Sequence, residues 1–290
     1  MAAYLRPSAL PDALEALASR ATGGRGWVVV AGATDHYPAR VGRVPDEDVL
    51  DVSALGGLRG IIGGATGTAE SGWRIGALTT WSDLADADDL PPLFAGLRRA
   101  ARTIGGLQVQ NRATLAGNLC NASPAADGVP NLLALDAAVE LASASGVRRV
   151  PLGEFIVGNR RTVRRPEELV TGILVPPPLA DTTVRSAFEK LGSRAYLVIS
   201  IAMVAAILEV DREGRIARAR LAVGACSEVA ERLTALETEL RGRRPAEAPA
   251  IPRSDHLATL SPIDDVRGSA AYRQDAALVL VRRALEALAG

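Results

Sequence analysis

The sequence predicts an α+β protein with two domains, and three observations support this prediction. Its 290 residues fit roughly two domains of ~100–200 residues each. Hydrophobic residues make up 48% of the chain and charged residues 23%, so a large core can form. Short β-rich runs beside glycines alternate with helix-like segments in the first half, whereas a hairpin pattern followed by helices fills the end of the chain.

The first half contains two predicted helices and three predicted short strands. Residues 10–18 place leucines at helical spacing, and Pro11 and Asp12 suit the first turn of that helix. Residues 92–101 repeat the same spacing. Apolar runs beside turn-forming glycines predict strands at 27–31, 58–62 and 73–78.

A second domain is predicted after the three prolines at 176–178, which cannot continue a helix or a strand ladder and are interpreted as a linker. Residues 195–210 and 215–225 are predicted to form a hairpin. The second of these strands alternates apolar residues with Arg218 and Arg220, which predicts a sheet with one covered face. The remaining predicted elements are helices at 228–240 and 272–288 and an exposed loop at 245–254.

Composition and charge exclude several classes of function. Lysine and arginine total 33, as do aspartate and glutamate, so the chain lacks the basic surface that nucleic-acid binding requires. Two cysteines cannot form a disulfide framework or ligate an iron–sulfur cluster, and two histidines argue against a metal site. The apolar run 195–208 is too short to span a membrane. The N-terminus does not resemble a signal peptide, so a cytoplasmic location is expected.

One candidate ligand-binding loop follows the predicted strand at 27–31. Small residues at a strand end allow backbone N–H groups to approach phosphate oxygens, and Thr34 can donate a further hydrogen bond. The segment does not match the GxGxxG pattern, which argues against a standard dinucleotide fold. A simple β-turn is the alternative, and His36 beside it is interpreted as a structural or surface histidine. The loop comprises Ala31, Gly32, Ala33, Thr34 and Asp35.

A second candidate loop lies at 114–118, where Thr114 and Asn118 flank small residues and could bind a pyrophosphate. Asp127, further along, could accept a hydrogen bond from a ribityl or ribose hydroxyl. The alternative is a buried polar loop that stabilises itself. Neither Cys120 nor Cys226 has a neighbouring base to lower its pKa, so both are predicted to be packed thiols.

Several segments, in order, carry a resemblance to a known family. They are AGATDHYPARVG (31–42), IGALTTWSDL (75–84), QNRATLAGNLCNASPAADGVP (110–130), PEELVTGILVP (166–176), FEKLGSR (188–194) and AAYRQDAALVLVRRALEAL (270–288). Together they resemble the FAD-binding medium subunit of the molybdenum hydroxylases, the xanthine dehydrogenase and carbon monoxide dehydrogenase flavoprotein family. The resemblance implies a vanillyl-alcohol-oxidase-type (PCMH-type) FAD-binding domain at 1–178, with subdomains at about 1–57 and 58–178. It also implies a C-terminal α+β flavoprotein domain at 179–290.

The resemblance also implies which residues bind FAD. The family's AGGTD loop corresponds to residues 31–35, and its TIGGN loop corresponds to residues 114–118, so Ala33 and Ala116 replace glycines. If either position needs a positive φ, the methyl group costs on the order of 1 kcal/mol. The implied FAD-binding set is Ala31, Gly32, Ala33, Thr34, Asp35, His36, Ile104, Thr114, Leu115, Ala116, Gly117, Asn118, Asp127, Leu169 and Lys190. Ordinary core packing is the alternative for Leu169, and a solvated surface position is the alternative for Lys190.

The implied function is that of the FAD subunit of a heterotrimeric molybdenum hydroxylase. It would take electrons from a [2Fe-2S] small subunit and pass them to an external acceptor, while a molybdopterin large subunit hydroxylates the substrate. No catalytic residue is predicted, because the flavin itself carries the chemistry. Two alternatives stay open. The first is a stand-alone FAD oxidoreductase of the same fold with a covalent flavin on His36 or Cys120, and the second is a cofactor-free interaction subunit.

Overall fold

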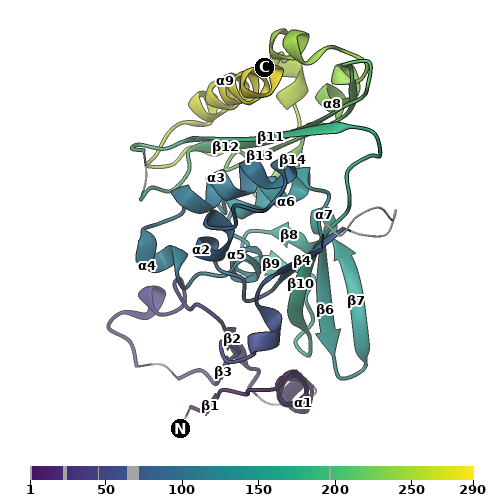
Figure 1. Ribbon diagram of the computed structural model, residues 1–290. Helices are drawn as coiled ribbons and strands as arrows, with labels where there is room; N and C mark the ends of the chain where they lie inside the picture. Colours follow the sequence, from purple (N-terminus) through teal and green to yellow (C-terminus); the bar gives the residue numbers. More distant parts are fainter. Residues whose placement is uncertain (1, 22–24, 45, 64–71, 196) are drawn as a thin grey trace.

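The computed structural model describes residues 2–21, 25–44, 46–63, 72–195 and 197–290. Three principal sheets follow one another along the molecule (Figure 1). A small parallel sheet lies at the N-terminal end, a five-stranded antiparallel sheet lies in the middle, and a four-stranded antiparallel sheet lies beneath the C-terminal helices. The mixed helix and strand content confirms the predicted α+β class.

The N-terminal sheet packs against the first predicted helix. Its strand order is β1–β3–β2, and both pairings are parallel. Helix α1 (Leu10–Ala21) has Asp12 in its first turn, as predicted, and buries Ala13 and Leu17 in a core shared with Leu50. The strands are β1 (Tyr4–Leu5), β2 (Val28–Val30) and β3 (Val49–Asp51).

The five-stranded sheet has the order β4–β5–β10–β6–β7. Its central strand is β10, which pairs with both β5 and β6. This strand follows all four of its sheet partners in the sequence. The predicted strand 58–62 begins later, at Ile61, because Leu58 ends a 3-10 helix and Gly60 has a φ of 109°. The strands are β4 (Ile61–Gly63), β5 (Trp73–Gly76), β6 (Ala138–Ser143), β7 (Gly146–Pro151) and β10 (Leu169–Val175).

Along the sequence, short helices and a small hairpin lie between β5 and β10, together with β6 and β7. The helix predicted at 92–101 starts with a 3-10 turn, Pro92–Phe94, and continues as α3. The elements are α2 (Trp81–Ala85), α3 (Ala95–Thr103), α4 (Leu107–Gln110), α5 (Leu115–Asn121), α6 (Gly128–Ala134), α7 (Leu152–Phe155), β8 (Ile156–Gly158) and β9 (Arg161–Thr162).

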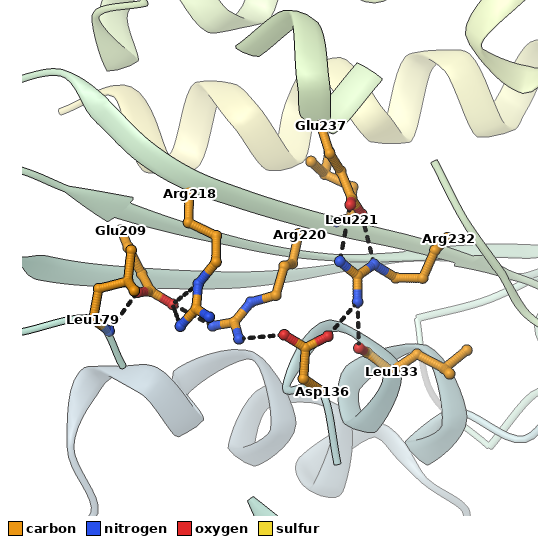
Figure 2. A network of polar contacts seen from close by, with 9 residues as sticks. All are labelled: Leu133, Asp136, Leu179, Glu209, Arg218, Arg220, Leu221, Arg232 and Glu237. Atoms are coloured by element: carbon orange, nitrogen blue, oxygen red, sulfur yellow. Dashed lines mark hydrogen bonds and ion pairs between the residues drawn. The ribbon is translucent and has the colours of Figure 1, made fainter. Parts of the chain in front are cut away.

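The C-terminal sheet, β11 to β14, lies between two layers of helices (Figure 1). Helices α8 and α9 cover one face, and α3 and α6 cover the other. The prediction that only one face of this sheet is covered is therefore wrong, because helices cover both faces. Arg220 on β13 is only 3% exposed, because it faces α6 and pairs with Glu209 and Asp136 (Figure 2). The elements are β11 (Thr183–Leu191), β12 (Ala202–Val210), β13 (Ile216–Gly224), β14 (Glu231–Arg232), α8 (Thr234–Leu240) and α9 (Ala270–Ala289).

Three further boundaries differ from the sequence predictions. The hairpin strand predicted from residue 195 starts at Ala202, and residue 196 lies outside the described residues. The helix predicted from residue 228 starts at Thr234, because Glu231 and Arg232 pair with β13 instead. The loop predicted as exposed at 245–254 contains the 3-10 helix Pro245–Ala250, which packs against α9, and a second 3-10 helix, Ser254–Leu257, follows. In the described part of the chain, every helix is too short or too polar to cross a membrane.

Candidate functional site

A cavity of about 1230 Å³ lies between the N-terminal sheet, helix α5 and the β8–β9 hairpin. It exceeds the roughly 300–1,000 Å³ of most small-molecule sites. Both candidate loops reach it, although they are about 80 residues apart in sequence. The predicted residues that line it are Ala31, Gly32, Ala33, Thr34, Asp35, His36, Ile104, Thr114, Ala116, Gly117, Asn118, Asp127 and Leu169. Leu115 and Lys190 do not line it.

The first loop depends on close backbone contact at Gly32. A Cβ atom at this position would lie 1.8 Å from the carbonyl oxygen of Arg112, so no side chain fits there without movement. Ala33 next to it has a φ of 56°, which is the left-handed region that favours glycine. Alanine stands at both positions where the resembled motifs have glycine, Ala33 and Ala116. Only Ala33 has a positive φ, because Ala116 lies within helix α5.

The second loop is the start of helix α5. The Thr114 hydroxyl accepts a hydrogen bond from the Gly117 N–H at 3.0 Å and so caps the helix. Leu115 points into the hydrophobic core and is fully buried, so it can face a ligand through its backbone alone. The residues after it, Gly117 and Asn118, face the cavity.

Two polar atoms in the cavity wall lack a partner within the described residues. Asn118 Oδ1 and His36 Nε2 are buried without a hydrogen bond, and Nε2 lies 3.9 Å from the nearest oxygen of Glu47. Burial, followed by the charge of Arg40, lowers the pKa of His36 below its usual value, so its imidazole is neutral at pH 7. Unpaired buried polar atoms are costly in a folded protein. Both therefore fit a ligand that carries several hydrogen-bonding groups, as FAD does.

The Asp127 carboxylate in the cavity wall accepts a hydrogen bond on each of its two oxygens. Lys190 Nζ donates to its Oδ2 at 2.6 Å, and Ser200 Oγ donates to its Oδ1 at 2.5 Å. Burial raises the pKa of Asp127, while the Lys190 charge and both hydrogen bonds oppose that rise. The Lys190 side chain is 8% exposed, so it is not a solvated surface ammonium. Each carboxylate oxygen keeps a free lone pair for a ligand hydroxyl.

A group of arginines around the cavity was not among the predicted site residues. Arg160 Nη1 donates to Asp35 Oδ2 at 2.8 Å and also to Asn121 Oδ1, and so joins the β8–β9 hairpin to the first loop and to α5. The sequence signal is the basic run NRRTVRR (159–165) in a chain of zero net charge. Positive side chains at this site suit an anionic group such as a diphosphate. The cavity-lining arginines are Arg40, Arg160, Arg161 and Arg164.

The two cysteines differ in solvent exposure, which the sequence did not indicate. The prediction of a packed thiol is wrong for Cys120, which is accessible from the cavity that it lines, because helix α5 turns it toward the opening. Neighbouring protein atoms still displace much of the water around the sulfur, and this desolvation raises the pKa of Cys120 to about 11. Cys226 is fully buried, as predicted, and burial raises its pKa to about 11 as well. Neither thiol is ionised at neutral pH.

Two family models match this chain. The model of the FAD binding domain in molybdopterin dehydrogenase matches residues 1–178, and that of the CO dehydrogenase flavoprotein C-terminal domain matches residues 186–288. The fold is similar to reconstituted CO dehydrogenase from Oligotropha carboxidovorans, with a TM-score of 0.85, 26% identity and coverage of 100% of this chain and 99% of that chain.

Relatives named as dehydrogenase subunits resemble the chain over about three quarters of its length or more. The glyceraldehyde dehydrogenase medium chain of Sulfolobus acidocaldarius is 30% identical over 99% of this chain and 98% of its own. The carbon monoxide dehydrogenase medium chain of Afipia carboxidovorans is 30% identical over 98% of this chain and 95% of its own. The xanthine dehydrogenase FAD-binding subunit of Escherichia coli O157:H7 is 31% identical over 77% of this chain and 73% of its own. The chain therefore belongs to the family of FAD-binding medium subunits of the molybdopterin-containing dehydrogenases, a family of oxidoreductase subunits whose cofactor is FAD.

Proposed function

We propose that this chain is the FAD subunit of a heterotrimeric molybdenum hydroxylase, and that it receives electrons from a [2Fe-2S] small subunit and delivers them to an external acceptor. The cavity carries the proposal, because two glycine-containing loops, two unpaired polar atoms and four arginines converge on it. The relatives named as medium chains and FAD-binding subunits support the assembly with a molybdopterin large subunit. With two cysteines, the chain itself lacks the four thiolates that such a cluster usually needs.

The chain's own residues have binding roles in this proposal. When bound, FAD supplies the redox chemistry, and the protein supplies orientation and electrostatics. The arginines of the basic run and the amides of the first loop would hold the diphosphate. Asn118 Oδ1 and His36 Nε2, which have no partner among the described residues, would bond to the ligand. Asp127 would accept a hydrogen bond from a hydroxyl of the sugar or ribityl chain. No residue is assigned as a general acid or base.

Visible absorption of the purified chain, before and after heat denaturation, is the first test. Flavin released into the supernatant supports noncovalent FAD. Flavin that stays with the precipitate indicates a covalent link and a stand-alone oxidoreductase. A colourless protein that takes up no added FAD contradicts the proposal and favours the cofactor-free interaction subunit.

The cysteine pair provides an internal test of where FAD binds. We expect added FAD to protect Cys120 from a small maleimide, because Cys120 lines the cavity. Cys226 is the internal control, because its side chain is buried and should stay unlabelled in both samples. The measurement is mass spectrometry of the labelled peptides with and without FAD. Equal labelling of Cys120 in both samples would place FAD elsewhere.

Electron transfer requires a partner and is tested with the assembled complex. We expect affinity purification of the tagged chain to recover a [2Fe-2S] protein and a molybdopterin protein. Chemical reduction of the cluster in the absence of air should then bleach the flavin band. A chain that purifies alone, or a flavin that stays oxidised beside a reduced cluster, would refute the proposed electron path. A cytoplasmic complex fits the two free thiols of the described chain.

We also propose that the chain divides at the prolines 176–178 into residues 1–178 and 179–290. The family models, which match 1–178 and 186–288, support this division. A subdivision of the first part near residue 57 is supported by the separate core that surrounds α1 and β3. Limited proteolysis that cuts first within 176–182 would agree with the main boundary.

A further inference from the structure

We propose that Ser200 is a positioning residue for the cofactor cavity, through which the C-terminal domain orients Asp127 and thereby couples FAD binding to the contact between the two domains. The inference rests on the proposed binding of FAD in this cavity. It concerns a residue that lies outside both candidate loops and that does not line the cavity itself.

Both oxygens of Asp127 are held by residues of the C-terminal domain. Lys190 belongs to β11, and Ser200 lies just before β12, so neither partner comes from the domain that contains Asp127. Ser200 is 1% exposed, and its hydroxyl makes no other hydrogen bond within the described chain. Among the described residues, these two donors make the hydrogen bonds that fix the rotamer of the carboxylate at the cavity wall.

Ser200 is itself held firmly by its neighbours. The Ile201 N–H donates to the Leu191 carbonyl at 2.8 Å, which closes the connection between β11 and β12. Arg273 of α9 is buried and donates to the Ile201 carbonyl at 2.6 Å. A path of contacts therefore runs from the C-terminal helix through Ile201 and Ser200 to the cavity.

The C-terminal domain also holds the other end of the helix that follows Asp127. Every residue of α6 is buried. At its C-terminal end, Asp136 accepts hydrogen bonds from Arg220 at 2.8 Å and from Arg232 at 2.6 Å, and Arg232 also donates to the Leu133 carbonyl (Figure 2). Helix α6 is thus attached to the C-terminal sheet at both ends, which fixes the position of the backbone that carries Asp127.

Other polar links between the domains also reach segments that line the cavity. The Ala225 N–H donates to the Pro124 carbonyl at 3.0 Å, and Glu228 accepts from the Asn159 N–H at 3.0 Å. Pro124 follows the cavity-lining Ser123, and Asn159 precedes Arg160. Any ligand that binds better when Asp127 is oriented must, by reciprocity, strengthen the contacts that orient it.

The test compares FAD dissociation constants of full-length variants by quenching of flavin fluorescence. We expect Ser200→Ala to raise the dissociation constant about tenfold, the change that roughly 1.4 kcal/mol of lost binding energy gives. Ser200→Thr keeps the hydroxyl and should recover most of the affinity. In an Asp127→Ala background, Ser200→Ala should have no further effect, because the hydroxyl acts through that carboxylate.

Ser186→Ala is the matched control. Ser186 on β11 also contacts the other domain, because its Oγ accepts a hydrogen bond from the Gly96 N–H at 2.8 Å, but it does not line the cavity. Wild-type affinity in Ser200→Ala, or an equal loss in Ser186→Ala, would overturn the inference while leaving FAD binding intact. Failure of the wild-type chain to bind FAD would instead refute the proposed function. If Ser200→Ala does not fold, Ser200→Cys provides a weaker donor of similar shape for the same comparison.

Discussion

Ala33 occupies a backbone conformation that its methyl group makes costly. Its φ of 56° suits glycine, and the family motif that this loop resembles has a glycine at this position. We expect Ala33→Gly to raise the free energy of unfolding by about 1 kcal/mol and to tighten FAD binding. Ala116→Gly should not, because Ala116 is helical and glycine lowers helix stability. Chemical denaturation and FAD titration of both variants check the contrast, and an equal gain from both would contradict it.

Gly32 should tolerate no larger residue. A methyl group there would overlap the Arg112 carbonyl, so Gly32→Ala must separate the first loop from residues 112–113. We expect most of the bound FAD to be lost on purification, as the ratio of flavin to protein absorbance would show. Gly26→Ala is the control, because a Cβ atom at Gly26 meets no atom within 4 Å. Normal flavin content in Gly32→Ala would contradict this expectation and show that the loop and residues 112–113 can separate without loss of FAD.

At the residue scale, two short motifs predicted the two loops that meet at the cavity, because loop residues that approach a ligand leave a local pattern of small and polar types. It could not predict the Lys190–Asp127 contact, which joins positions 63 residues apart. It also left the basic run at 159–165 unassigned, because arginine runs are usually solvated. The accessibility of Cys120 depends on the direction in which α5 faces, which no local pattern specifies.

Helix α5 begins at a cap that also shapes the cavity. We expect Thr114→Ala to lower the free energy of unfolding by about 1 kcal/mol, because the Gly117 N–H loses its acceptor. FAD affinity should fall as well, since Gly117 and Asn118 line the cavity. Thr114→Ser should restore both quantities, as measured by urea unfolding and FAD titration. Unchanged stability in Thr114→Ala would show that water replaces the cap without cost.

At the element scale, periodicity located the first helix and the hairpin, but not where the hairpin strand starts. Leu197 and Ile199 continue the apolar pattern of β12, although they are exposed and lie outside the strand. The alternation in β13 was read as a solvated face because arginines usually reach water. Here a second layer of helices covers that face, and Arg220 pairs with Glu209 of the neighbouring strand and with Asp136, which lies 84 residues earlier in the sequence. Which helices cover a strand depends on the tertiary fold, so the alternation within β13 alone could not predict it.

The network between the domains predicts how the whole molecule responds to acid. Burial acts to raise the pKa of Asp136, but hydrogen bonds from Arg220 and Arg232 outweigh it and hold that pKa below the ordinary 3.8. This carboxylate therefore stabilises the fold at pH values above 3.8, and the contribution disappears as pH falls through the lower folded-state pKa. We expect wild type to lose stability between neutral pH and about pH 3 more steeply than Asp136→Asn. Urea unfolding across this range measures both, and parallel pH profiles would contradict the assignment.

The position of β10 in the middle of the five-stranded sheet has a consequence for how the protein is made. During synthesis, β4, β5, β6 and β7 leave the ribosome before the strand that joins them, and Leu169 and Val170 of that strand line the cavity. The donors that hold Asp127 emerge later still. Because domains fold as their residues become available, the nascent chain cannot complete this cavity until Ser200 has been translated. We therefore expect FAD to enter the proposed site late in the maturation of this subunit.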